Sequence, residues 1–256
     1  MKKILYNQFN IKLLISLFFF SLYLFYNFNI YLLLFLILIF IISFFNFGKE
    51  INKNHGIEID NNSRLGGLSI ITTIIAVFFY SDYFNYFALS FENFYFYLIV
   101  LIAITLLGLT DDILGRIGHL IRLYFNIFAI FILLYTNSIF IFEKTNIEFI
   151  NNILNIKIIS FTLTILIIVG FINASNIADG ANGILSGISA ISFLVFYLST
   201  NAILYFVIFE ILLFFFIYNI IVGKIYLGDA GSYFLGFLIS TNALYLYNIN
   251  IVSAGL

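Results

Sequence analysis

Three short polar segments, each containing aspartate, interrupt a chain that is otherwise rich in Ile, Leu, Phe and Tyr. They are residues 108–112 (GLTDD), 173–180 (NASNIADG) and 227–232 (LGDAGS). Only 9% of all residues are charged, and an acidic side chain beside an apolar span is costly unless it is paired or binds a ligand. The sequence therefore predicts that the chemistry of this protein resides in these three segments.

The first segment ends in two adjacent carboxylates, Asp111 and Asp112. Neighbouring residues on a helix point about 100° apart, so these side chains cannot form one symmetric pair. At a helix end they suit divided roles, in which one faces a metal or a phosphate and the other takes a proton. The alternative is that they cap the helix expected to begin near Gly118, or are simply solvated.

The second segment opens a series of polar side chains at every third position. The series consists of Asn173, Asn176, Asp179 and Asn182. Residues three apart share a helix face but drift by about 60° per step, so the series wraps across one side or the helix ends within it. Gly180 and Gly183 favour the helix end. Carboxylate and amide groups there can bind sugar hydroxyls, a base edge or the waters of a metal ion, whereas C-capping would explain only one of them.

The third segment combines small residues with one carboxylate and follows a lysine, Lys224. Glycines let a ligand approach the backbone, and the helix expected to begin near Ser232 has an N-terminal dipole that favours phosphate. Asp229 is a hard oxygen ligand suited to Mg²⁺, and Lys224 is a point charge suited to a diphosphate. Tyr226 could stack on a base, although packing at the membrane interface is the more ordinary role for a tyrosine in such a chain.

Long apolar stretches must position these segments. The chain has 256 residues and is 63% hydrophobic with a mean hydropathy of +1.13, which is typical of an integral membrane protein. About 20 helical residues cross the hydrocarbon core once. We therefore expect an all-α polytopic transmembrane bundle of about nine spans. Two of them divide residues 11–47 near 27–29, and the others cover residues 66–82, 94–110, 120–141, 158–173, 183–199, 202–221 and 232–248.

The distribution of basic residues orients these spans. With the N-terminus inside, only Lys144 and Lys157 fall in outside loops. The inside loops hold Lys2, Lys3, Lys12, Lys49, Lys53, Arg64, Arg116, Arg122 and Lys224. This positive-inside bias predicts a cytoplasmic N-terminus. All three aspartate segments then lie at the cytoplasmic face, where we expect the active site.

Composition excludes several other classes of protein. The net charge of −1 gives no electrostatic basis for nucleic-acid binding, and the absence of Cys excludes disulfides and thiolate metal sites. The apolar N-terminal stretch has no small-residue cleavage site, so we interpret it as a retained membrane helix. We expect residues 1–256 to form one integral membrane domain.

Taken together, the segments resemble the polyprenyl-phosphate N-acetylhexosamine-1-phosphate transferase family, and most closely its N-acetylglucosaminyl branch. The matching motifs are Arg64-x-Gly-Gly67, Gly108-Leu109-x-Asp-Asp112, Arg122-Leu123, Asn173-Ala-x-Asn176-x-x-Asp-Gly180 with Asn182-Gly183, and Asn219-x-x-x-x-Lys224-x-Tyr-Leu-Gly-Asp-x-Gly-Ser232. Their order and spacing match over most of the chain, and the second and third segments together are highly specific.

The resemblance implies an enzyme that crosses the bacterial inner membrane several times, among membrane lipids. Undecaprenyl phosphate would attack the β-phosphate of a UDP-N-acetyl sugar, giving a lipid-diphosphate sugar and UMP. Mg²⁺ would be the cofactor, with Mn²⁺ as an alternative, and no nucleic acid would take part. The product would initiate a cell-envelope glycan such as a polysaccharide or lipopolysaccharide. A homodimeric assembly is left open.

The resemblance also implies a role for each matching side chain. Asp229 and Asn176 would hold the metal, and Asp111 would act as base toward the lipid phosphate, with Asp112 supporting it or the metal site. The substrate-binding residues would be Asn173, Asp179, Asn182, Lys224, Arg64 and Gly67, with Tyr226 at the uracil. This set fits phosphoryl transfer, which needs positioning and charge neutralisation more than covalent help.

The match departs from the family pattern in several places. Asn182 stands where bacterial members usually carry Asp, and the usual prolines before Arg64 and Lys224 are missing. A basic, His-containing cytoplasmic loop and a last helix of the family are not found before Leu256. Two alternatives follow, a truncated inactive paralogue that acts as a scaffold and a membrane transporter. A transporter needs ionisable groups near the bilayer midplane, and Glu210 alone lies there, most simply as a protonated, hydrogen-bonded side chain.

Overall fold

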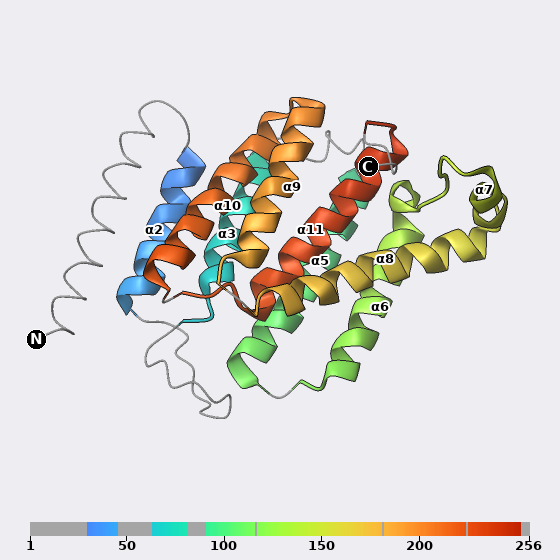
Figure 1. Ribbon diagram of the computed structural model, residues 1–256. Helices are drawn as coiled ribbons and strands as arrows, with labels where there is room; N and C mark the ends of the chain where they lie inside the picture. The colour runs from blue at the N-terminus through green and yellow to red at the C-terminus, as the bar shows by residue number, and fades with distance from the viewer. Residues whose placement is uncertain are drawn as a thin grey trace, which may run out of the picture.

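The computed structural model describes residues 30–45, 63–80, 91–115, 117–180, 182–223 and 225–251, and helices dominate these residues (Figure 1). The long helices of the described part are α2 (Ile30–Phe45), α3 (Gly66–Tyr80), α5 (Phe91–Leu114), α6 (His119–Thr136), α8 (Lys157–Ala178), α9 (Ile184–Thr200), α10 (Ile203–Val222) and α11 (Gly228–Asn248). A 3₁₀ turn, η1 (Ser138–Phe140), and the short helix α7 (Glu148–Leu154) lie between α6 and α8.

This architecture confirms the expected all-α membrane bundle. Four of the described helices, α5, α6, α8 and α10, are long and apolar enough to cross a membrane. Every span expected from residue 66 onward has a helix at its position, and α2 begins just after the turn expected at 27–29. The other half of the pair predicted in residues 11–47 lies outside the described residues.

Helix boundaries differ from the hydropathy prediction at two places. α8 continues past the expected end at residue 173 to Ala178, so the helix itself carries the first polar residues of the second segment. α6 ends at Thr136, before the expected residue 141, and η1 follows it. The Asn137 side chain donates to the Thr136 hydroxyl (3.0 Å) and to the Asn93 carbonyl (3.4 Å). Such local side-chain bonds compete with helix continuation, and hydropathy does not register them.

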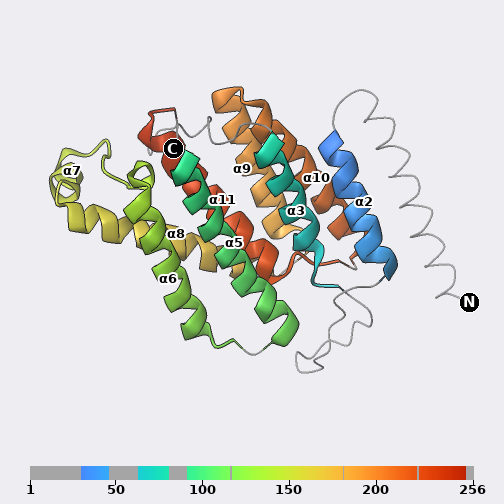
Figure 2. The ribbon, with the colours of Figure 1, turned by 180° about the vertical axis from the view of Figure 1, so that it is seen from behind.

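Helix α11 forms the centre of the bundle. It packs against α5 and α8, and also against α3 and α9; α5 lies behind it in Figure 1 and in front of it in Figure 2. Nearly all its side chains from Gly228 to Leu246 are buried. A helix that is buried all round needs no single apolar stripe, which explains why small and polar residues are spread over its surface.

Two buried hydrogen bonds fix the rotation of α11 about its axis. The Tyr97 hydroxyl of α5 lies 3.2 Å from the Thr241 hydroxyl, and the Tyr205 hydroxyl of α10 donates to the Asn242 carboxamide oxygen at 2.7 Å. In a membrane interior each such bond contributes about 0.6 kcal/mol on average. These bonds matter more for orientation than for stability, because they set which residues at the start of α11 face α5 and α8.

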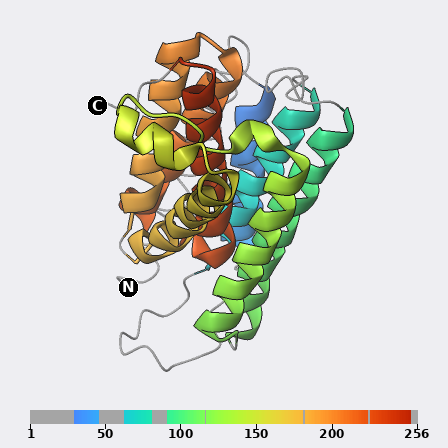
Figure 3. The same cartoon turned by 90° about the vertical axis from the view of Figure 1, so that its right-hand side faces the viewer.

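The helix α8 is steeply inclined to its neighbours. It runs from α7, at the edge of the molecule, down to the first turn of α11 (Figure 1). In Figure 3 it points toward the viewer, while α5 and α6 run side by side. The close approach of α8 to α11 uses a small residue, since Gly236 faces Ile172 and Ser175 of α8. This inclination brings the end of α8 to the start of α11.

Candidate active site

The three aspartate segments meet at one end of the bundle, as the distribution of basic residues predicted. The last turns of α5 and α8 and the first turn of α11 lie near one another in the lower half of the molecule as drawn in Figure 1. They surround a pocket of about 310 Å³. Its lining residues are Arg64, Asp112, Asn176, Asp179, Gly180, Asn182, Tyr226, Gly228 and Asp229. All but the two glycines are residues for which the sequence predicted a role.

A short parallel pairing of two chain segments holds Arg64 and Tyr226 at this pocket. Ser63 and Ile225 form a parallel bridge, and the Tyr226 N–H donates to the Ser63 carbonyl at 2.8 Å. The buried Asn219 side chain of α10 donates to the Ile225 carbonyl at 2.6 Å. Asn219 belongs to the family-like motif, and in the structure its side chain holds the loop between α10 and α11 in place.

The predicted substrate residue Gly67 makes a packing contact instead of facing the pocket. Its N–H donates to the Leu227 carbonyl at 2.9 Å, and the Gly66 N–H donates to the Tyr226 carbonyl at the same distance. These bonds satisfy two of the first N–H groups of α3, which have no partner within the helix. A Cβ on Gly67 would lie 2.6 Å from the Gly231 Cα, so both positions must be glycine for α3 and α11 to touch.

Asp112 caps the start of α11. Its two carboxylate oxygens accept the N–H groups of Asp229 and Ala230, each at 2.9 Å. The first N–H groups of a helix lack partners, and a negative charge there interacts favourably with the helix dipole. The capping alternative named the helix that begins near Gly118 and was wrong, because that helix has no side-chain cap; Asp112 instead caps α11, whose residue Asp229 lies 117 positions later. Asp112 also lines the pocket.

Asp111 belongs to an ion-paired cluster that the sequence did not predict. The Nη1 of Arg122, on α6, lies 2.6 Å from Asp111 Oδ2 and 2.8 Å from Asp229 Oδ2. Asp111 Oδ1 also accepts the Ile117 N–H at 3.1 Å. A single guanidinium nitrogen thus links the first and third segments through charge-assisted hydrogen bonds, which are the strong kind.

The second segment forms the end of α8, as Gly180 and Gly183 suggested. The helix stops at Ala178, and Gly183 has a φ of +80° that suits glycine. The Asn176 carboxamide oxygen accepts the Ser232 hydroxyl of α11 at 2.8 Å. The Asn173 side chain donates to the Val169 carbonyl of its own helix at 2.8 Å, and it is not among the residues that line the pocket.

Asp179 follows the last residue of α8 and faces the pocket. Burial raises the pKa of its carboxyl group from 3.8 to about 8. The Gly228 N–H and the Arg64 charge oppose this rise, while the neighbouring charges of Asp229 and Asp112 add to it. The pocket therefore holds more acidic groups than its basic residues balance, which is an environment that favours a bound cation.

Gly228, the first residue of α11, has a backbone conformation that suits glycine. Its φ is +75°, a region that residues with a Cβ rarely adopt. A Cβ here would also collide with the Arg64 carbonyl and lie 2.7 Å from the Asp112 Oδ2. The absence of a side chain at Gly228 lets the Arg64 carbonyl and the Asp112 carboxylate approach the start of α11.

The pocket offers oxygen ligands to Mg²⁺ without a closed protein site. Within the described ranges, no three His, Asp or Glu side chains are arranged to hold a metal ion together. Mg²⁺, however, commonly takes one or two carboxylates and completes its shell with water and substrate phosphates. Asp229 and the Asn176 oxygen supply donors of this kind on facing helices, so the residues present fit a metal that is shared with substrate.

Two further predicted residues lie apart from this geometry. Lys224, predicted to bind phosphate, lies outside the described residues. Glu210 lies half-buried within α10, has an interaction partner, and does not line the pocket.

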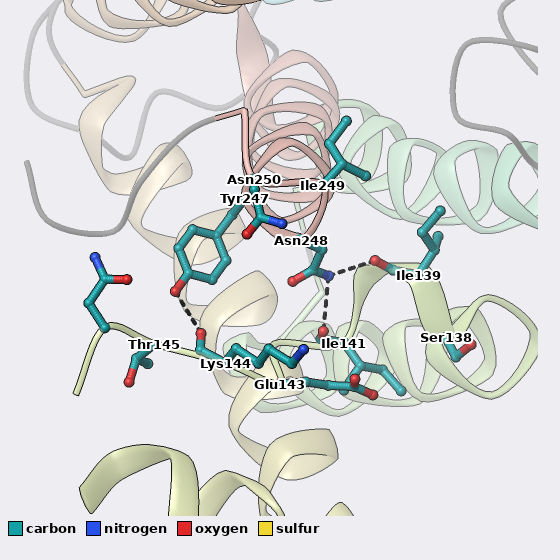
Figure 4. A pocket seen from close by; sticks show the side chains of 11 residues that line it. Ser138, Ile139, Ile141, Glu143, Lys144, Thr145, Tyr247, Asn248, Ile249 and Asn250 are labelled. Carbon is teal, nitrogen blue, oxygen red and sulfur yellow. Dashed lines mark hydrogen bonds between the residues drawn. The ribbon is translucent and has the colours of Figure 1, made fainter. Parts of the chain in front are cut away.

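A second, larger pocket lies at the other end of α11. It has a volume of about 630 Å³, and Figure 4 shows the residues that line it from η1, the following loop and the end of α11. The Tyr247 hydroxyl donates to the Lys144 carbonyl (2.6 Å), and the Asn248 side chain donates to the carbonyls of Ile139 and Ile141 (2.7 and 3.0 Å). None of the three aspartate segments contributes to this pocket.

Comparisons with known proteins bear on the same residues. The sequence model described as "Glycosyl transferase family 4" matches residues 94–247, which include all three aspartate segments. The chain is similar to the phospho-N-acetylmuramoyl-pentapeptide-transferase of Staphylococcus carnosus (strain TM300), with 41% identity over 85 residues, 30% of this chain and 26% of that protein. It is also similar to the protein of the same name from Fervidobacterium nodosum (strain ATCC 35602 / DSM 5306 / Rt17-B1), with 38% identity over 87 residues, 32% and 28% of the two chains. The matched stretch thus spans about a quarter of each curated relative.

Proposed function

Because the family match covers more than half of its residues, this chain belongs to glycosyl transferase family 4, and from that premise we propose that it transfers a sugar-1-phosphate to a polyprenyl phosphate. The donor would be a UDP-N-acetylhexosamine, and the acceptor undecaprenyl phosphate. The products would be undecaprenyl-diphosphate sugar and UMP, which begins a cell-envelope glycan at the cytoplasmic face of a bacterial inner membrane.

One observation carries this proposal: three carboxylates and an arginine from distant segments line a single pocket at the end of a membrane bundle. The residues are Asp112, Asp179, Asp229 and Arg64. Transfer of a phosphoryl group brings together two anionic substrates, so it depends on placed cations and positioning. A pocket at the end of apolar helices can receive a water-soluble nucleotide sugar from one side and a lipid phosphate from the membrane.

The donor would bind along the wall formed by Arg64, Tyr226 and the end of α8. Arg64 supplies a guanidinium for the diphosphate, and Tyr226, held beside it by the parallel pairing, suits the uracil ring. Asp179 and Asn182, which follow the end of α8 and line the same pocket, can accept and donate hydrogen bonds to sugar hydroxyls.

The chemical step would take place beside Asp229. Asp229 and Asn176 would hold Mg²⁺, which when bound neutralises charge on the diphosphate and the leaving UMP. Asp111, linked to Asp229 through Arg122, would accept the proton of the lipid phosphate. Asp112 would act indirectly, because its oxygens hold the first turn of α11 in place.

Two donor sugars remain as candidates. The residues Asn173-Ala-Ser-Asn176 and Leu227-Gly-Asp-Ala-Gly-Ser232 look closer to the N-acetylglucosaminyl branch. The two curated relatives carry the name of the transferase for phospho-N-acetylmuramoyl-pentapeptide, which favours the UDP-linked muramoyl-pentapeptide donor. The substrate panel below distinguishes them.

The test is release of UMP by purified protein in lipid nanodiscs. The protein receives undecaprenyl phosphate, Mg²⁺ and one of several UDP-N-acetyl sugars, including UDP-N-acetylglucosamine and UDP-N-acetylmuramoyl-pentapeptide. We expect UMP release with one donor, dependent on both the lipid phosphate and the metal. No release with any donor from folded protein would reject the enzyme and favour the inactive scaffold.

A further inference from the structure

The position of Arg122 between two carboxylates has a consequence for cation binding. Its Nη1 lies within 3 Å of oxygens from both Asp111 and Asp229. The side chains of Arg122, Asp111 and Asp229 are only 21%, 14% and 24% exposed, so water and salt screen this cluster weakly. Arg122 is thus a positive charge already present at the carboxylate that the proposed function gives to the metal.

A divalent cation and this guanidinium make incompatible demands on Asp229. Mg²⁺ binds carboxylate oxygens at about 2.0–2.1 Å, and the guanidinium nitrogen lies 2.8 Å from Asp229 Oδ2. Two cations on one carboxylate would lie within a few ångströms of each other, where repulsion in a weakly screened site is strong. Asp111 offers Arg122 a second, shorter contact, so the guanidinium can leave Asp229 without losing every partner.

We propose that Arg122 is the counter-ion of Asp229 when no divalent cation is bound and competes with the cation for that carboxylate. The cation displaces Arg122 from Asp229, and the guanidinium stays on Asp111. This inference rests on the proposed function only in taking Asp229 as the metal ligand. The opposite arrangement is also chemically reasonable: Arg122 could hold one Asp229 oxygen while the other binds metal, which would strengthen metal binding.

Metal affinity separates these two arrangements without any assay of turnover. Free Mn²⁺ is measured by electron paramagnetic resonance during titration of the wild type, Arg122→Gln and Arg64→Gln. Competition predicts that Arg122→Gln binds Mn²⁺ at least about tenfold more tightly, since a charge-assisted contact no longer has to be broken. Arg64→Gln removes a nearby charge that acts on Asp179 and controls for general repulsion, with an expected change of about twofold.

Three outcomes would overturn the competition. They are weaker or unchanged Mn²⁺ binding by Arg122→Gln, an equal gain in Arg64→Gln, and no binding by either the wild type or Arg122→Gln. Arg122→Lys provides a second variant if the Gln protein does not fold. It keeps the positive charge on a shorter side chain that is less able to contact Asp111 and Asp229 together. We therefore expect an Mn²⁺ affinity between those of the wild type and Arg122→Gln. An affinity at or below that of the wild type would count against the proposal.

The displacement itself can be observed because the chain contains only three arginines, Arg64, Arg116 and Arg122. Protein labelled with ¹⁵N-arginine gives three Nε–H signals, which single substitutions assign. Saturating Mg²⁺ should move the Arg122 signal in the wild type and leave it in place in Asp229→Asn. An Arg122 signal that stays fixed at saturating Mg²⁺, in protein that binds Mn²⁺ in the titration, would contradict displacement. Absence of UMP release with these results intact would reject the proposed activity and leave the competition standing.

Discussion

The two ends of α11 differ in the kind of interaction that holds them. At its start, carboxylates, arginines and glycine contacts from α3, α5, α6 and α8 surround a pocket of about 310 Å³. At its end, neutral side chains donate to backbone carbonyls around a pocket of about 630 Å³. The smaller pocket gathers three carboxylates, whereas the larger one is lined by one residue of each charge, Glu143 and Lys144. Chemistry is better located by groups that are costly to bury than by the size of a cavity.

The difference also has a thermodynamic side. Neutral hydrogen bonds at the C-terminal end of α11 stabilise the fold at little cost, whereas Asp112, Asp179 and Asp229 share one pocket and repel one another. A fold that is only marginally stable retains such repulsion at functional sites and offsets it elsewhere. The following substitutions test whether function and stability divide along α11 in this way.

The largest effect is expected from Asp229→Asn at the start of α11. Loss of one carboxylate removes the proposed metal ligand and an ion pair with Arg122, so UMP release should fall by about 10²–10³-fold. Glu210→Gln, in the middle of α10, serves as the matched control and should stay within about twofold of the wild type. Loss of activity in the Glu210 variant alone would contradict this assignment of the site.

Gly228→Ala should lower stability more than any change at an open glycine. The φ of +75° and the collision with the Arg64 carbonyl together cost about 1–3 kcal/mol, which thermal unfolding in detergent would record as a fall in Tm. Gly118→Ala is the control, because φ is −61° there and no atom lies within 4 Å of the added Cβ. Equal Tm values for the two variants would show that the contacts at the start of α11 are loose.

Asp179 should make stability depend on pH. Its pKa is about 8 in the folded protein and near 3.8 in the unfolded chain, so the unfolded chain loses this proton first as pH rises. Its contribution to stability is therefore fully present below about pH 4, declines as pH rises, and levels off above about pH 8. Asp179→Asn should remove this decline and raise Tm at pH 8, while weakening donor binding. A lower Tm for the variant at pH 8 would mean that the carboxylate is ionised and paired in the folded protein.

The smallest effect is expected at the C-terminal end of α11. Tyr247→Phe removes one hydrogen bond to the Lys144 carbonyl and should cost about 0.5–1.5 kcal/mol. UMP release should remain within about twofold of the wild type, because no residue of the aspartate segments lines that pocket. A large loss of activity without a loss of Tm would show that the pocket at the C-terminal end of α11 takes part in the reaction.

The sequence predicted the parts of the site that depend on local pattern and membrane topology. Long apolar stretches predicted the positions of the helices, and the distribution of basic residues predicted that the aspartate segments lie at one end of the bundle. The glycines after Asp179 indicated the end of α8. These features are visible because each is encoded within one span or one loop, and the end of the bundle at which a loop lies follows from counting spans.

The contacts between distant segments could not be predicted from one sequence. Asp112 caps a helix that begins more than a hundred residues later in the sequence. Arg122 and its partner Asp229 are separated by 107 positions. Residues 63–67 pair with residues 225–227. Local periodicity carries no information on such partners. Two features of the sequence pointed to Arg122, the family-like motif Arg122-Leu123 and its place on the same predicted membrane side as the aspartates. Neither of them identified Asp111 and Asp229 as its partners.

The most direct test of the account is to find which end of α11 binds the nucleotide. A UDP-N-acetyl sugar with a photoreactive uracil is crosslinked to the protein in nanodiscs, with and without excess UMP, and the labelled residues are mapped by mass spectrometry. We expect UMP-protected labelling at Tyr226 or its neighbours in the 225–232 segment. UMP-protected labelling of Lys144 or Tyr247, with none at the start of α11, would contradict it.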